Sequence, residues 1–61
     1  MIIKKTYEDN QWVTFKPIDI SYDMGYLWVT GIVIDSTWLK LEKGDIWDFQ
    51  LCNVCTIEVV E

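Results

Sequence analysis

The chain has 61 residues, enough for one small domain, and it carries ten acidic side chains against five lysines, with no arginine and no histidine. Nucleic-acid binding depends on lysine and arginine that neutralise phosphates, so a net charge of −5 without arginine argues against a direct DNA or RNA binder. Hydrophobic residues make up 51% of the chain, which is too many for a disordered protein. The sequence therefore predicts one folded domain over residues 1–61.

The predicted location follows from the N-terminal residues and from the length of the apolar stretches. The N-terminal residues MIIKK do not contain the apolar segment of a secretory signal peptide. No stretch approaches the roughly 20 consecutive apolar residues that a membrane-spanning helix needs. We therefore expect a cytoplasmic protein that does not bind membranes.

The first third of the chain contains a predicted hairpin and an extended segment. Residues 2–7 and 12–16 have strand character, and residues 8–11 supply turn chemistry between them. Pro17 is expected to end the second strand, because proline cannot donate a ladder hydrogen bond. Residues 18–22 then alternate with a period of two, which is typical of an edge strand or an extended crossover and not of a helix.

The stretch from Tyr26 to Leu51 is the most strand-rich part of the chain, and it predicts an antiparallel meander with strands at 26–35, 37–42 and 46–52. The first of these is apolar on both faces, as in a central strand. Gly31 interrupts it, which predicts a bulge, a bend or a close backbone approach. Gly44 is expected to supply a positive φ in the following turn. Residues 55–60 alternate again and predict a last strand.

These elements predict an all-β fold: a small antiparallel barrel of five to seven short strands, because no run of ten or more residues has helical periodicity. The chain length favours an SH3-like or OB-like barrel over a sandwich. The fragment LEKGDIWDF, residues 41–49, resembles the strand-turn-strand units of SH3-like and swapped-hairpin barrels. The acidic turn of Glu8 and Asp9 near Trp12 is similar to the peptide-binding groove of SH3 domains, although the ordered aromatic motif of that family is missing.

Residues with catalytic or metal-binding chemistry do not form a complete site in the sequence. Serine has no histidine to act as its base, and the odd spacing of Asp45 and Asp48 puts them on opposite faces of one strand. Cys52 and Cys55 supply two of the four ligands of a zinc site, so such a site would need two chains. Otherwise they are small apolar thiols near a turn. We predict no enzyme activity and no cofactor.

The aromatic residues are the strongest functional signal, because four tryptophans exceed what so small a core can cover. Strand parity places four side chains in the core: Val13, Phe15, Trp47 and Phe49. Trp12 and Trp38 instead share their faces with polar residues, and exposed tryptophan is typical of interface anchors. The alternative is a barrel that covers them within one chain. The predicted partner-binding residues are Trp38, Trp12, Lys40, Glu42 and Asp35.

Together these features favour a non-catalytic protein-interaction module, a small regulator or inhibitor that occludes a basic surface of a partner protein. Aromatic anchors would supply affinity, and the acidic rim would select the partner. In size and character the chain looks like the accessory and inhibitor proteins of bacteriophages and mobile elements. Two alternatives stay open: self-assembly into a homo-oligomer through an apolar surface or an open strand edge, and an acidic mimic of nucleic acid.

Overall fold

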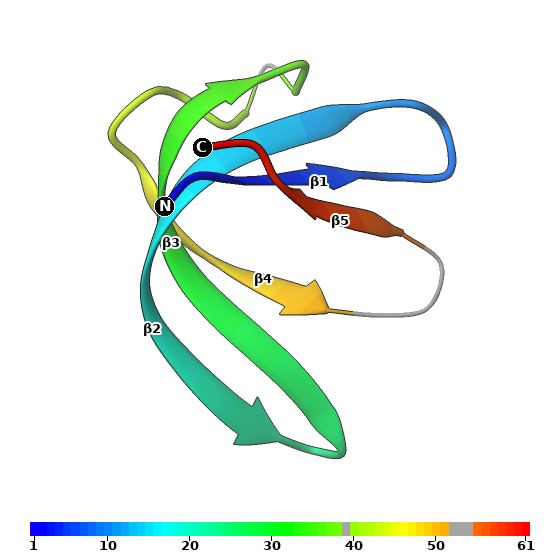
Figure 1. Cartoon of the computed structure of the whole chain (residues 1–61), viewed down its shortest axis with the longest axis vertical. Coiled ribbons are helices and arrows are strands. Elements are labelled where there is room, and N and C mark those ends of the chain that lie inside the picture. The colour runs from blue at the N-terminus through cyan, green and yellow to red at the C-terminus, as the bar shows by residue number, and fades with distance from the viewer. Residues whose placement is uncertain (39, 52–54) are drawn as a thin grey trace.

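The structure is a computed structural model that describes residues 1–38, 40–51 and 55–61, and within these ranges it contains strands and no helix (Figure 1). The strands are β1 (Ile3–Thr6), β2 (Trp12–Asp23), β3 (Tyr26–Ser36), β4 (Ile46–Leu51) and β5 (Thr56–Val59). The predicted all-β class is therefore confirmed.

All five strands belong to one antiparallel sheet, with the order β4-β3-β2-β1-β5. β4 pairs with residues 27–32 of β3, whereas β1 pairs with residues 12–15 of β2. These two strands are therefore attached to different halves of the long ribbon formed by β2 and β3. Within the described ranges no ladder joins β4 to β5, so the sheet is antiparallel as predicted but is not closed into a barrel.

The prediction that Pro17 ends a strand is wrong, because β2 continues through it to Asp23. Pro17 lies opposite Gly31 and Asp19 lies opposite Thr30, so Ile18 is the extra residue of a bulge. The bulge accommodates a residue that cannot donate to the ladder, and it also bends the strand. Two predicted segments, 12–16 and 18–22, are consequently one twelve-residue strand.

The expectation for Gly31 is confirmed as a close approach. A Cβ atom on this residue would lie 2.4 Å from Cδ2 of Phe15, closer than real side chains pack. The absent side chain leaves room for the Phe15 ring, which stacks on Phe49 with the ring centroids 4.2 Å apart. Gly31 thus fixes the position of the largest fully buried side chain of the described core.

Residues 37–42 were predicted to form a strand, and this is wrong for those that the structure describes, which lie in the loop between β3 and β4. Ser36 Oγ accepts a hydrogen bond from the Trp38 backbone N–H at 2.9 Å, and the Leu41 N–H donates to the Trp38 carbonyl at 3.2 Å. Such local bonds compete with a strand ladder and turn the chain. The turn that follows contains Gly44, whose positive φ of 94° agrees with the prediction.

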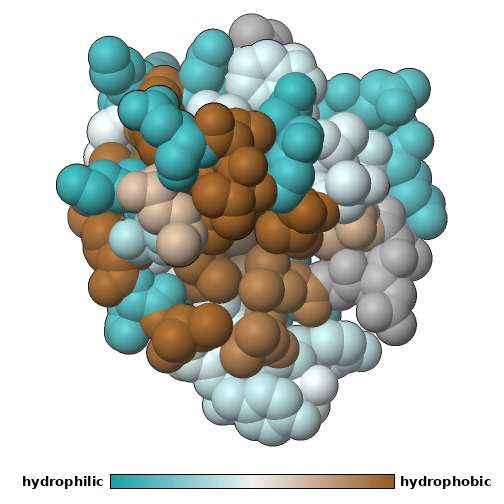
Figure 2. All heavy atoms as spheres, in the orientation of Figure 1, coloured by the Kyte–Doolittle hydropathy of each residue, from teal (hydrophilic) through white to brown (hydrophobic). Residues whose placement is uncertain are grey.

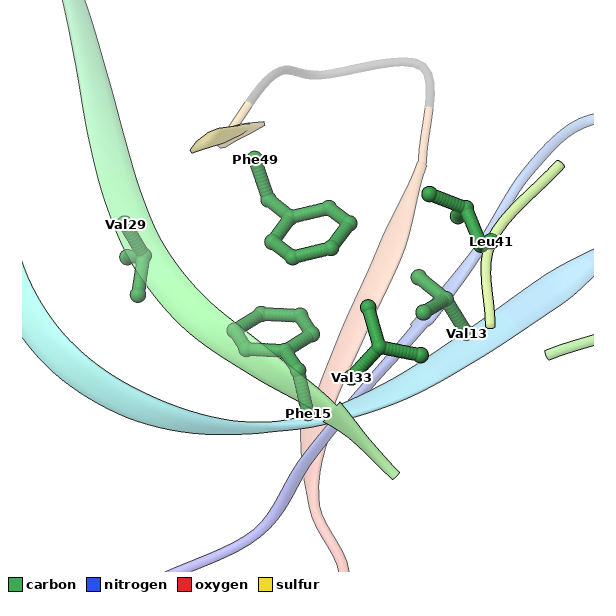
Figure 3. Packing of buried hydrophobic residues seen from close by; sticks show 6 residues of the cluster. All are labelled: Val13, Phe15, Val29, Val33, Leu41 and Phe49. Atoms are coloured by element: carbon green, nitrogen blue, oxygen red, sulfur yellow. The ribbon is translucent and has the colours of Figure 1, made fainter. Parts of the chain in front are cut away.

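The core lies between the curled strands and is small (Figure 3). Its buried hydrophobic residues are Val13, Phe15, Val29, Val33, Leu41 and Phe49. Strand parity therefore placed Val13, Phe15 and Phe49 correctly. Trp47, which has the same parity as Phe49, is 46% exposed and lies outside the core.

Beyond the bulge, β2 and the start of β3 extend past the core as a hairpin, which we call the arm (residues 18–28; lower part of Figure 1). Ile20 and Val29 are opposite each other, as are Tyr22 and Leu27, so these side chains continue the face that carries the core. Ile20 is nevertheless 61% exposed and Tyr22 74% exposed. Hydrophobic side chains accordingly form a band along the middle of the surface shown in Figure 2.

Candidate binding groove

A pocket of about 280 Å³ opens beside the core between the end of β1, the β3–β4 loop and β4. Most of its lining is aromatic or aliphatic: Tyr7, Trp28, Trp38, Leu41, Trp47 and Phe49. We call this surface the aromatic groove. Phe49 and Leu41 belong to the buried core, so the lining of the groove is continuous with that core.

Trp38 and Tyr7 form one wall of the groove by stacking on each other, with ring centroids 4.8 Å apart and an interplanar angle of 26°. Each ring lies next to a tight local turn. The turn after Tyr7 is closed by the Asn10 N–H, which donates to the Tyr7 carbonyl at 3.0 Å, and Asn10 has a positive φ of 67°. The turn at Trp38 is fixed by the Ser36 hydroxyl. Trp38 keeps 36% of its surface exposed, so the stacked pair presents aromatic area to solvent.

Two further tryptophans of the groove come from the sheet. Trp47 lies on β4 directly opposite Gly31, which has no side chain, and it is 46% exposed. Trp28 is half-buried and its indole N–H donates to the Asp23 carbonyl at 3.4 Å. Exposed indoles next to a packed floor are the arrangement that interface anchors adopt.

An acidic turn adjoins the stacked Tyr7 and Trp38 rings. Glu8 and Asp9 line a second hollow of about 310 Å³ together with Tyr7 and Trp38. Both carboxylates are exposed, and Asp9 accepts hydrogen bonds from the backbone N–H and the side-chain amide of Gln11 at 3.2 and 3.0 Å. The Gln11 contacts hold Asp9 in place, so negative charge is fixed beside exposed aromatic surface.

Lys5 lines the groove but is not among the predicted partner-binding residues. Its side chain is only 4% exposed, and its Nζ donates to the Gln50 carbonyl at 2.6 Å while lying 4.7 Å from the centroid of the Tyr7 ring. Lys5 shares one face of the first predicted strand with Ile3 and Tyr7. That parity was the available signal, but nothing in the sequence shows that β4 lies close enough to accept its hydrogen bond.

The predicted partner-binding residues are divided between two surfaces. Trp38 and Lys40 line the aromatic groove. Trp12 lies opposite Thr6 on the other face of the sheet, half-buried, with Lys4 Nζ 5.0 Å from its ring centroid. Asp35 is exposed on β3 opposite Thr14 of that same face.

Glu42, the remaining member of the predicted set, is exposed in the β3–β4 loop, where its backbone N–H donates to Asp45 Oδ2 at 3.0 Å. The structure therefore brings Trp38 and Lys40 together with Tyr7, and it does not bring Trp12 to them. The stacking partner of Trp38 was not predictable by parity, because the two rings come from separate turns.

The acidic and cysteine candidates do not converge in the described part of the chain, where no three acidic or cysteine side chains gather closely enough to hold a metal ion. Asp48 accepts a hydrogen bond from the Thr30 hydroxyl, and Asp45 accepts the Glu42 N–H. Cys55 is half-buried, and Cys52 lies outside the described residues, so the shared zinc site stays a prediction.

Comparisons with protein-family models, with curated proteins and with solved structures find no significant match to this chain. Among the described residues, no helix is long and apolar enough to cross a membrane.

Proposed function

We propose that this protein is a non-catalytic interaction module that holds a segment of a partner protein in the aromatic groove. The observation that carries the proposal is the partly exposed Tyr7–Trp38 stack beside the buried core residues. Aromatic side chains on a rigid support lose little conformational entropy on binding and bury much area, which makes them efficient anchors. The partner segment would occlude Trp38 and Trp47, and the protein would act by covering the surface that carries this segment.

The charge of the proposed partner follows from the acidic turn. Glu8 and Asp9 lie beside the stacked rings, and the whole chain carries a net charge of −5. A basic residue of the partner next to its apolar anchor would find both an aromatic face and a carboxylate there. Long-range attraction to a basic surface would also speed association. These features support a regulator or inhibitor that occludes a basic surface.

The finer fold assignment is part of the same proposal. An SH3-like arrangement is supported by four strands in a meander, β1 to β4, with β5 returning beside β1. An acidic turn lies between β1 and β2, and the aromatic groove lies beside it. This placement is similar to that of the peptide-binding groove of SH3 domains. On this proposal the open side of the sheet is where the groove lies.

Replacing Trp38 with alanine tests the proposal, with Trp12→Ala as the matched control on the other face of the sheet. Tagged wild-type protein and both variants would be incubated with extract of the source cells, and retained proteins identified by mass spectrometry. We expect Trp38→Ala to lose the partner that wild type and Trp12→Ala retain, with unchanged far-ultraviolet circular dichroism. Loss with Trp12→Ala alone would place the binding surface on the opposite face and reject the groove.

Self-assembly is a second candidate, and the exposed arm favours it. Ile20, Tyr22 and Met24 are 61%, 74% and 87% exposed, and they lie on a hairpin that extends beyond the core. Two copies could bury these apolar side chains against each other about a twofold axis. Sedimentation of the wild type and of Ile20→Lys over a range of concentrations tests this. A wild type that stays monomeric at every concentration would reject it.

A further inference from the structure

Lys5 is buried to an extent that is unusual for a lysine. Among the described residues it is the one charged side chain classed with the buried positions, at 4% exposure. Lysine is almost never buried to this extent unless an acidic group pairs with it, because removing an unpaired charge from water is strongly unfavourable. A buried lysine in so small a domain therefore needs a compensating group.

Among the described residues, the Lys5 amino group has one hydrogen-bond acceptor and one aromatic ring as compensation. The amino group donates one hydrogen bond to the Gln50 carbonyl and lies over the Tyr7 ring, and a lysine amino group has three donor positions. Within the described ranges no carboxylate pairs with it; the acidic lining residue, Asp48, accepts from the Thr30 hydroxyl. The four residues outside these ranges are Leu, Cys, Asn and Val, so by sequence they bring no carboxylate either.

Lys5 lies at the edge of the groove, where its amino group has no carboxylate partner among the described residues. Lys5 and both groups that it contacts, Gln50 and Tyr7, line the same pocket, and Lys40 lines it as well. The rest of the lining is mainly aromatic. An occupant suited to this site combines an apolar or aromatic body, which packs on the indoles, with a negative group that reaches Lys5 Nζ.

We propose that the aromatic groove recognises a carboxylate attached to an apolar or aromatic residue, and that this carboxylate forms an ion pair with Lys5 Nζ. The proposal rests on the function proposed above and names the chemistry of the partner segment. A partner's C-terminal carboxylate and an acidic side chain next to an apolar residue both present this chemistry. Glu8 and Asp9 line the neighbouring hollow, which shares Tyr7 and Trp38 with the groove, so a basic residue of the segment would be favoured there and would fix its direction.

The test compares small probes that differ in charge alone. N-acetyl-phenylalanine carries a terminal carboxylate, its amide is the neutral control, and N-acetyl-phenylalanyl-glutamine amide and N-acetyl-phenylalanyl-glutamate amide compare a neutral with an acidic side chain. Binding is followed by indole fluorescence. Because a charged hydrogen bond in a partly desolvated site is strong, we expect at least one acid to bind about tenfold more tightly than its neutral counterpart.

The variant Lys5→Met removes the charge while keeping an unbranched side chain, and Lys16→Met, at an exposed position of β2, is the matched control. We expect the preference for the acid to disappear in Lys5→Met and to persist in Lys16→Met. If Lys5→Met fails to fold, NMR of the wild type replaces it. The acidic probe should then move the backbone N–H signals of Gln50 and Tyr7, and its neutral counterpart should not.

Equal binding of both acids and their neutral counterparts, retention of the preference in Lys5→Met, or no binding of any probe at millimolar concentration would overturn the proposal. These results are distinguishable from failure of the proposed function. A partner lost in Trp38→Ala, combined with no acid preference, would keep the function and reject the carboxylate. An acid preference that depends on Lys5, combined with partner retention by Trp38→Ala, would keep the carboxylate site and reject the proposed function.

Discussion

The two halves of β2 have the same alternation of apolar residues but opposite environments. Val13 and Phe15, before the bulge, are fully buried, whereas Ile20 and Tyr22, after it, are 61% and 74% exposed. The difference comes from what lies across the curled sheet: Phe49 and Leu41 cover the first half. Alternation thus determines which face a side chain occupies, and a second layer of chain determines whether that face is buried. The first half should therefore carry the stability, and the second half should be available for contacts.

The largest expected effect is on the covered half. Phe15→Ala removes the ring that stacks on Phe49, and the cavity should cost about 3–5 kcal/mol. A 61-residue domain has a total stability of only about 3–9 kcal/mol, so the variant should lose a third or more of it. Urea denaturation followed by tryptophan fluorescence measures this. A loss below about 1 kcal/mol would show that the Phe15 site is not a tightly packed core position.

Gly31→Ala should have the next largest effect, because its Cβ would overlap the Phe15 ring. Overpacking of this kind costs about 1–3 kcal/mol. The double variant Phe15→Leu/Gly31→Ala gives the decisive control, since a smaller side chain leaves space for the new methyl group. The two changes should be strongly non-additive in denaturation experiments. Simple additivity would mean that the cost at Gly31 comes from the backbone and not from this contact.

Two glycine turns allow a matched comparison of the core end with the arm. Gly44 and Gly25 have φ values of 94° and 83°, and in both an added Cβ would meet no atom within 4 Å. Alanine at Gly44 should cost about 1–2 kcal/mol, because this backbone conformation is unfavourable for residues with a Cβ. Gly44 is also anchored by its N–H to the Val33 carbonyl at 2.8 Å. Alanine at Gly25, at the tip of the arm, should cost less stability than alanine at Gly44. Thermal unfolding of both variants measures the two losses, and a larger loss at Gly25 would contradict this expectation.

The smallest effect is expected at the exposed half of β2. Ile20→Ser should change stability by less than about 0.5 kcal/mol, as at most surface positions. The measurement should be made at low and at high protein concentration. A loss that grows with concentration would show that another copy covers the arm, which would remove the contrast between the two halves and support self-assembly.

Much of the fold was predictable because it depends on local features. The all-β class, the core parity of Phe15 and Phe49 and the close approach at Gly31 all follow from alternation and from the missing Cβ of glycine. The strand at 37–42 was wrong because the alternation of that segment reflects burial of Leu41 and not an extended backbone. The break at Pro17 was wrong because a bulge accommodates the missing donor.

The groove was predictable only in part. Trp38 was identified as an aromatic residue left at the surface, and it lines the groove. Its contact with Tyr7 joins two turns distant in the sequence, and no pattern within either segment reports it. Trp47 has core parity but lies on an edge strand opposite a glycine, and it stays 46% exposed. Lys5 was also not predictable, because its hydrogen bond depends on the Gln50 carbonyl of β4.

That contact of Lys5 has a mechanical consequence. In the described chain β1 and β4 share no backbone ladder, and the Lys5 amino group bridges them through the Gln50 carbonyl. A ladder would hold two strands at a fixed separation, whereas a lysine side chain spans a range of lengths by rotating its methylene bonds. We therefore expect an occupant that draws the amino group toward itself to remove this bridge, and the distance between β1 and β4 could then change with the occupant.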